Sequence, residues 1–133
     1  MPRFLDTNIL LYSISQDSSE TAKRDRAFGI IDAGDNALSV QVLQEFYVQT
    51  TRRDRLPHDI ATGLIRTWLR FKIQETSVSI MTGALEIKAE HGLSYWDAAI
   101  VAAARALGCR ELYSEDMTHG REIESVTIIN PFR

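Results

Sequence analysis

The sequence predicts an α/β domain built on a parallel sheet, and two observations lead to this fold class. Short apolar runs of strand length, such as 36–40 and 109–114, alternate with longer stretches whose apolar residues recur at helical spacing. The chain has 133 residues, of which 44% are hydrophobic, and this fits a single globular domain over 1–133. The sequence contains no internal repeat, low-complexity segment or linker that would divide it.

In the first half of the chain, helices are expected to follow two short strands. A strand over 2–6 leads into a short helix over 8–14, and a polar break separates that helix from the next one, over 20–33. Gly34 is suited to cap the second helix at its C-terminus. The later elements are a strand over 36–40, a helix over 41–53 and a helix that starts at Pro57 and reaches about Phe71.

The second half repeats the alternation. A strand over 73–77 precedes a helix over 79–90 that ends at Gly92, and a further helix runs from Ser94 to Gly108. A strand over 109–114 and a last strand over 127–129 complete the predicted sheet.

The composition excludes a membrane protein and a disulfide framework. No window of ~18 residues is apolar enough for a membrane span, and the apolar run at the N-terminus is too short and too polar at 6–8 for a signal peptide. Cys109 is the only cysteine, which favours the reducing cytoplasm. The histidines show no metal-ligand spacing and are expected at the surface or in turns; they are His58, His91 and His119.

Asp6 stands between two apolar elements, the strand that contains Phe4 and Leu5 and the helix that begins near Ile9. A carboxylate in such a position costs free energy unless something neutralises it. A helix N-cap is an equally good interpretation when this residue is taken alone.

Asp97 is the most informative acid of the chain. On a helix it shares a stripe with Ile100, Val101 and Ala104, which is the face expected to point inward. Ser94 lies three residues earlier, so an N-terminal capping arrangement is the structural alternative. An acid on an inward face requires a cation, and we therefore favour a functional interpretation.

Two further acids complete the pattern. Glu45 lies beside Val42 on its helix, and a solvated side chain is the better interpretation when this residue is taken alone. Asp116 ends a strand, and the alternative interpretation is an ordinary turn residue. Ligands of parallel sheets bind beyond the carboxyl ends of the strands, so Asp6 and Asp116 are expected to meet at one edge. Converging carboxylates repel one another, and some of them should have a raised pKa.

Four carboxylates without a cluster of Cys or His suit a hard cation such as Mg²⁺ or Mn²⁺. A site of this kind supports hydrolysis of a phosphodiester bond. The net charge of −3 argues weakly against a nucleic-acid partner, but setting the four acids aside takes the charge of the remaining chain from −3 to +1.

In its acidic motifs the chain resembles the PIN-domain ribonucleases, and in its size it resembles the VapC toxins of bacterial toxin–antitoxin pairs. The matching stretches, in chain order, are Phe4-Leu5-Asp6-Thr7-Asn8, Glu45 after the second strand, Tyr95-Trp96-Asp97-Ala98-Ala99-Ile100, and Ser114-Glu115-Asp116. Together they cover the whole chain. One departure follows Asp116, where Met117 stands in place of the aromatic residue that is common in the family.

This resemblance implies a parallel sheet of about five strands flanked by helices, and the activity of a metal-dependent endoribonuclease. It implies a homodimer in the cytoplasm and an antitoxin protein that blocks the site. It also implies that the catalytic and metal-binding residues are Asp6, Glu45, Asp97 and Asp116, with Thr7, Asn8 and Ser114 orienting the acids or the attacking water.

Basic residues are expected to guide the RNA substrate. The best placed are Arg52, Arg53 and Arg55, at the end of the helix that carries Glu45. A second basic group is interpreted as a solvated helix face; it comprises Lys23, Arg24 and Arg26.

Two other functions stay open at this point. In the first, the chain is a non-catalytic PIN-like domain that binds RNA or protein, and its acids are a relic site or an electrostatic patch. In the second, it is a receiver-like phosphoacceptor domain, which we disfavour because Asp6 has no acidic neighbour and the last lysine, Lys88, lies in mid-chain.

Overall fold

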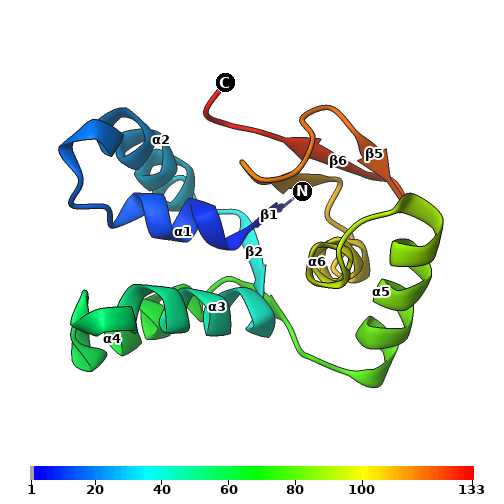
Figure 1. Ribbon diagram of the computed structural model, residues 1–133, viewed down its shortest axis with the longest axis horizontal. Coiled ribbons are helices and arrows are strands. Elements are labelled where there is room, and N and C mark those ends of the chain that lie inside the picture. The colour runs from blue at the N-terminus through cyan, green and yellow to red at the C-terminus, as the bar shows by residue number, and fades with distance from the viewer. Residues whose placement is uncertain (1) are drawn as a thin grey trace.

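A computed structural model describes residues 2–133, apart from the side chain of Asp54, and confirms the predicted α/β architecture (Figure 1). The strands are β1 (Arg3–Leu5), β2 (Asn36–Ser39), β3 (Lys72–Gln74), β4 (Glu111–Tyr113), β5 (Glu122–Ile123) and β6 (Val126–Ile129). The helices are α1 (Thr7–Ser13), α2 (Thr21–Asp32), α3 (Val40–Thr51), α4 (His58–Trp68), α5 (Val78–His91) and α6 (Tyr95–Ala106), with two short 3₁₀ turns, η1 (Ser18–Glu20) and η2 (Arg52–Asp54).

The strands form one six-stranded sheet in the order β3-β2-β1-β4-β6-β5. In this order β1 and β4 are the two central strands, and they pair with Leu5 opposite Tyr113. All neighbouring strands are parallel except β5 and β6, which are antiparallel. Because β1 and β4 run in the same direction, the chain leaves them at the same edge of the sheet. The residues that follow them, Asp6 and Ser114, are therefore neighbours.

The sixth strand, β5, was not predicted. It pairs antiparallel with β6 through a tight turn at Glu124 and Ser125, whose φ angles are +51° and +70°. Two consecutive residues with positive φ make the type of turn that suits a two-residue hairpin, but Gly or Asn usually occupies such positions. A Glu-Ser pair gives no such signal, so the prediction of about five strands missed this short edge strand.

Several predicted boundaries also differ. The helix expected over 41–53 ends at Thr51 and continues as the 3₁₀ turn η2, in which Arg53 has a φ of +57°. The helix expected to reach Phe71 ends at Trp68, and the strand expected over 73–77 is the shorter β3.

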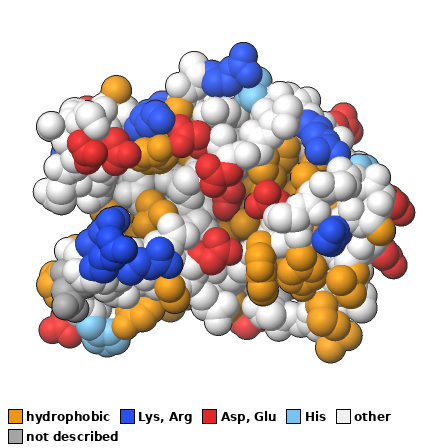
Figure 2. Space-filling view, viewed as in Figure 1, with side chains coloured by type: hydrophobic (Ala, Val, Ile, Leu, Met, Phe, Trp, Pro, Cys, Tyr) orange, Lys and Arg blue, Asp and Glu red, His pale blue; other side chains and the backbone are white. Residues whose placement is uncertain are grey.

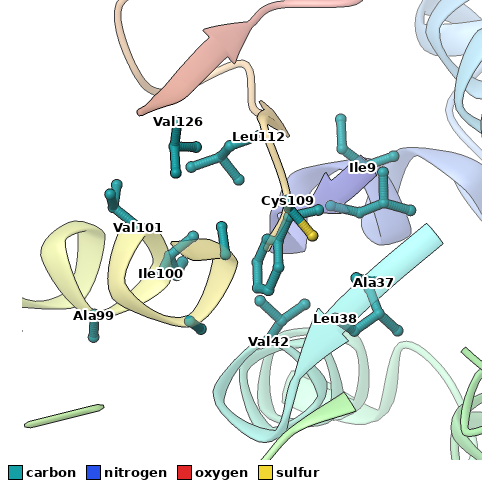
Figure 3. Close-up of a cluster of buried hydrophobic side chains, with 14 of the residues drawn as sticks. Ile9, Ala37, Leu38, Val42, Ala99, Ile100, Val101, Cys109, Leu112 and Val126 are labelled. Atoms are coloured by element: carbon teal, nitrogen blue, oxygen red, sulfur yellow. The ribbon is translucent and has the colours of Figure 1, made fainter. Parts of the chain in front are cut away.

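Helix α6 is the central helix of the core. Seven consecutive residues, Ala98–Ala104, are buried, because α5 packs along one side of α6 and the sheet along another. Five of these seven are alanines, which let the helix approach its neighbours closely. Figure 3 shows Ile100 and Val101 of α6 pointing toward Leu112, Val42 and Val126, which come from the sheet and from α3.

Short connections bring two helices directly to one edge of the sheet. Asp6 alone separates β1 from α1, and α3 begins at the residue after β2. Figure 1 shows α1 and α2 on one side of this edge, α3 and α4 on another, and α5 and α6 on the third. Over residues 2–133, none of the helices has the length and apolar character needed to span a membrane.

Candidate active site

A pocket of about 110 Å³ opens where β1 and β4 end, and all four predicted acids line it. Asp6 comes from the end of β1, Glu45 from α3, Asp97 from the first turn of α6 and Asp116 from the loop after β4. Figure 2 shows acidic side chains gathered near the middle of this face of the molecule. The remaining lining residues are Thr7, Asn8, Leu11, Gln49, Trp96 and Ile100.

Asp6 is the most buried of the four acids, with 4% of its surface exposed. One carboxylate oxygen accepts a hydrogen bond of 2.7 Å from the backbone N–H of Thr7, so Asp6 is indeed the N-cap of α1. The other oxygen accepts a hydrogen bond of 2.7 Å from the Ser114 hydroxyl. The capping interpretation is correct, and the same carboxylate also faces the pocket.

Burial raises the pKa of Asp6 to about 6. The hydrogen bonds from Ser114 and Thr7 lower the pKa, and the negative charges of Asp116 and Asp97 raise it further. The predicted rise is therefore present, but burial rather than mutual repulsion is its largest cause.

Asn8 joins the two strand ends. Its side-chain N–H groups donate to Asp116 at 3.1 Å and to Asp6 at 3.4 Å, and its carbonyl oxygen accepts from the backbone N–H of Glu115 at 3.2 Å. The Ser114 hydroxyl also accepts a hydrogen bond of 3.2 Å from the backbone N–H of Asp116. These contacts fix the loop after β4 against the first turn of α1 and hold Asp116 at the exposed rim of the pocket.

Glu45 is half-buried and hydrogen-bonded, so the interpretation of a freely solvated side chain is wrong. One oxygen accepts a hydrogen bond of 3.1 Å from the Thr7 hydroxyl, and the other accepts one of 2.8 Å from the side chain of Gln41. Gln41 also donates to the backbone carbonyl of Trp96, at 3.2 Å, and so connects Glu45 to the first turn of α6. Sequence reasoning missed Gln41, although its spacing of four residues from Glu45 is a recognisable helix signal.

Asp97 lies at the pocket wall, half-buried, and not in the packed core that begins at the next residue. Its backbone N–H donates to the Ser94 hydroxyl at 3.2 Å, so Ser94 caps the helix as the structural alternative expected. Burial raises the pKa of Asp97, and the charges of Asp116 and Glu45 raise it further, while contact with Ser94 lowers it. Capping and proximity to the other acids coexist at this turn.

The donor set suits a hard cation, because the pocket presents carboxylate, hydroxyl and amide oxygens without sulfur or imidazole. The acids are not drawn tightly together. Among the His, Cys, Asp and Glu side chains that the structure describes, three ligand atoms lie within 4.8 Å of one another only in Glu90, His91 and Glu124. This wider spacing of the four acids suits Mg²⁺, which usually keeps several of its water ligands in proteins.

The group Glu90, His91 and Glu124 lies near the opposite end of α6, because Arg105, in the last turn of that helix, is 3.7 Å from a Glu124 oxygen. The imidazole of His91 is 3.8 Å from an oxygen of each glutamate. The sequence spacing of the histidines gave no indication of this grouping, since β5 and β6 bring Glu124 to the end of α5 only in the folded chain. A guanidinium already faces Glu124 there.

Glu115 contacts Tyr12 and Lys23 and does not line the acidic pocket. Its carboxylate receives hydrogen bonds of 2.5 Å from both the Tyr12 hydroxyl and the Lys23 ammonium. Lys23 also lies over the Tyr12 and Phe132 rings, 5.0 and 5.8 Å from their centroids. The Lys23 side chain is still 42% exposed, as a solvated face implies, and it also holds the loop that carries Asp116 through Glu115.

The basic residues expected to guide RNA lie at the end of α3. Arg52, Arg53 and Arg55 are exposed in and after η2. Gln49 of the pocket wall lies one helical turn from Glu45 and leads toward them along the same face of α3. Seven helical steps separate Glu45 from Arg52, a distance of roughly 10 Å along α3.

Comparisons with known proteins agree on the fold. A model of the PIN domain family matches residues 3–121. No curated protein gives a significant match. The chain is similar to a toxin–antitoxin complex from Klebsiella pneumoniae, with a TM-score of 0.70, 21% identity and coverage of 97% of each chain.

Two other solved structures have the same fold. One is VapC20 of Mycobacterium tuberculosis, a sarcin–ricin loop cleaving toxin, with a TM-score of 0.68, 20% identity and coverage of 85% of this chain and 90% of that one. The other is VapBC2 from Rickettsia felis bound to a DNA fragment of its promoter, with a TM-score of 0.66, 18% identity and coverage of 96% and 97%. The family model spans nearly the whole chain and the fold agrees with it, so this protein belongs to the PIN domain family.

Proposed function

We propose that the chain is a divalent-metal-dependent endoribonuclease and the toxin of a toxin–antitoxin pair. The observation that carries the proposal is the convergence of four carboxylates, from four separate elements, on one small pocket. Membership of the PIN domain family and the similarity to solved toxins support it.

Asp6, Glu45, Asp97 and Asp116 would hold Mg²⁺ or Mn²⁺, directly or through water. When bound, such an ion supplies a Lewis acid that polarises a phosphate oxygen and lowers the pKa of a water molecule. The raised pKa of Asp6, about 6, fits this role, because a buried carboxylate that lacks an adjacent cation is destabilised as an anion.

The surrounding side chains would keep these acids in fixed positions. Ser114 and the Thr7 backbone hold the two oxygens of Asp6, and Asn8 holds Asp116 relative to Asp6. Thr7 and Gln41 hold the two oxygens of Glu45, which we assign to positioning the attacking water or the ion. Outer partners of this kind orient acidic ligands and affect metal affinity about 10–100-fold in known sites.

The RNA would approach along the α3 face, with its phosphates near Arg52, Arg53 and Arg55 and its scissile phosphate at the acids. The charges of the two regions are opposite, so the arginines would attract the RNA backbone while a bound cation offsets part of the negative charge at the acids.

Two protein partners belong to the proposal. An antitoxin is favoured because the solved neighbours include toxin–antitoxin complexes. A homodimer is favoured by the apolar residues exposed on α5, Val78, Met81 and Leu85, which are 73%, 44% and 50% exposed. Figure 2 shows hydrophobic side chains gathered over this part of the face. A cytoplasmic location, where RNA and reduced thiols occur, completes the proposal.

The decisive experiment is sequencing of new RNA ends after expression of the wild type and of Asp97→Asn. The wild type is expected to produce discrete new ends, and the variant is expected to produce none while remaining folded. If purified wild-type protein binds RNA but leaves it intact in Mg²⁺ and in Mn²⁺, the chain is a non-catalytic binding domain and the proposal is wrong.

A further inference from the structure

Trp96 is an exposed aromatic residue on the wall of the acidic pocket. It immediately precedes Asp97 in the first turn of α6, and 64% of its surface is exposed. Among the described residues that line the pocket, it is the only aromatic one. The other tryptophan, Trp68, is buried at 4% exposure against Phe46, so the two indoles have different environments.

The indole of Trp96 is exposed and contacts one neighbouring ring. Tyr95 packs against the core and meets the Trp96 ring edge to face, with the ring centroids 4.9 Å apart and the planes at 79°. The backbone carbonyl of Trp96 accepts the hydrogen bond from Gln41, which also holds Glu45. The backbone that carries the ring therefore belongs to the same hydrogen-bond network that positions Glu45.

We propose that Trp96 is a substrate-binding residue that stacks on a nucleobase next to the scissile phosphate. The inference rests on the proposed ribonuclease function. A phosphate at the acids leaves its adjoining nucleotide at the pocket rim, where the indole offers an aromatic surface. Unstacked bases of single-stranded RNA bind aromatic side chains in this way, and bases within a duplex are not available for it.

Stacking supplies an attraction that the acids cannot. The four carboxylates repel the RNA backbone, and a bound cation removes that repulsion only at the pocket itself. A base on Trp96 adds binding that depends little on salt or on base identity, since every base has an aromatic face.

The direct test uses fluorescence of the full-length chain with Trp68→Phe, which leaves Trp96 as the only tryptophan. The probe is a random-sequence pool of single-stranded RNA tetranucleotides, in Ca²⁺ to slow cleavage. The matched probe is a tetranucleotide of the same backbone without bases. We expect the pool to quench Trp96 and the abasic probe to leave it unchanged; equal quenching by the two probes, or none by either, would overturn the proposal.

A second measurement separates base stacking from a structural role. In cleavage of an unstructured RNA, Trp96→Leu should lower kcat/KM about 10-fold, mainly through KM, and Trp96→Phe should retain most of the activity because it keeps an aromatic face. Phe28→Leu is the matched control, because Phe28 is 61% exposed and does not line the pocket.

The outcomes distinguish this inference from the proposed function. If the wild type fails to cleave RNA but the base-dependent quenching persists, the ribonuclease proposal is wrong and Trp96 is still a base-binding residue. If the wild type cleaves and Trp96→Leu cleaves equally well, stacking is wrong and the ribonuclease proposal stands. Equal impairment of the Leu and Phe variants together with altered sedimentation would assign Trp96 to a protein interface and overturn the inference.

Discussion

At the scale of single residues, Asp6 connects stability with the proposed function. Its carboxylate caps α1 and is nearly buried, so the metal-free fold carries an anion in a position that disfavours charge. Proteins commonly retain such unfavourable groups where function needs them.

Asp6→Asn should stabilise the metal-free protein at pH 7. The pKa of Asp6 is about 6 in the folded chain, above its ordinary 3.8, so the folded state favours the protonated acid. The stabilising contribution of Asp6 to the free energy of unfolding is fully present below pH ~4. It is lost as the pH rises through ~6, and the loss lowers the free energy of unfolding by about 3 kcal/mol. Asparagine still accepts the hydrogen bond from Thr7 and has no charge.

Urea unfolding of the metal-free protein at pH 4.5, 6 and 7.5 measures this effect. The free energy of unfolding of the wild type should fall across this series more steeply than that of Asp6→Asn. The exposed acid Asp25 gives a matched control, Asp25→Asn, which should keep the steep wild-type dependence. Identical pH dependence in the wild type and Asp6→Asn would show that Asp6 is not perturbed.

Ser114→Ala should weaken metal binding without removing a proposed ligand. The buried hydroxyl donates to Asp6 and accepts from the Asp116 backbone, so its loss removes one contact from each of two acidic residues. We expect Mn²⁺ affinity, measured by calorimetric titration, to fall roughly 10-fold. Ser79→Ala, on the exposed surface of α5, is the control and should bind Mn²⁺ like the wild type.

At the scale of elements, the loop after β4 is held on both of its sides. On the pocket side, Asn8 and Ser114 accept hydrogen bonds from its backbone N–H groups. On the other side, Lys23 and Tyr12 donate hydrogen bonds to the Glu115 carboxylate. The position of Asp116 therefore depends on α2, which does not itself reach the pocket lining.

Glu115→Gln should lower cleavage activity while leaving the other acids in place. The amide loses the ion pair with Lys23, and the loop that presents Asp116 is held less firmly. Lys23→Met should have a similar effect, and the double variant should be no worse than either single variant, because both changes remove one contact. Additive losses in kcat/KM would mean that Lys23 and Glu115 act separately, for example through direct contact of Lys23 with RNA.

Sequence patterns predicted the elements that carry strong local signals. The central strands, the caps at Ser94 and Gly92 and the alanine-rich helix α6 all follow from period, cap residues and burial. Edge strand β5 escaped because its turn uses Glu124 and Ser125, which have no intrinsic preference for positive φ. Met117 takes a buried position after Asp116, so an apolar anchor is kept where the aromatic residue is missing.

The site could be predicted only in part, because its assembly depends on contacts between elements that are distant in the sequence. Each acid has an ordinary local explanation, and the four positions come together only through the strand order β2-β1-β4 and the packing of α6. Lys23 acts through a contact between elements, and Gln41 combines a local i,i+4 contact with Glu45 and a contact with Trp96 that only the folded chain provides.

At the scale of the whole molecule, the apolar face of α5 should mediate self-association. Val78, Met81 and Leu85 recur at helical spacing and are exposed in the single chain. The double change Met81→Glu with Leu85→Glu should convert a dimer into a monomer in sedimentation velocity at micromolar concentration. Val48→Glu, a change at an exposed apolar residue of α3, is the control and should leave the sedimentation coefficient unchanged; a wild-type monomer would contradict the prediction.

The central claim is that side chains distant in sequence form one divalent-cation site, and thermal unfolding in Mn²⁺ tests it most directly. With a millimolar dissociation constant, 10 mM Mn²⁺ stabilises the folded state by about 1.4 kcal/mol, which raises the Tm by roughly 5 °C. We predict this rise for the wild type and its absence for Asp97→Asn, which should be at least as stable as the wild type without metal. An equal rise in both proteins, or none in the wild type, would contradict the claim.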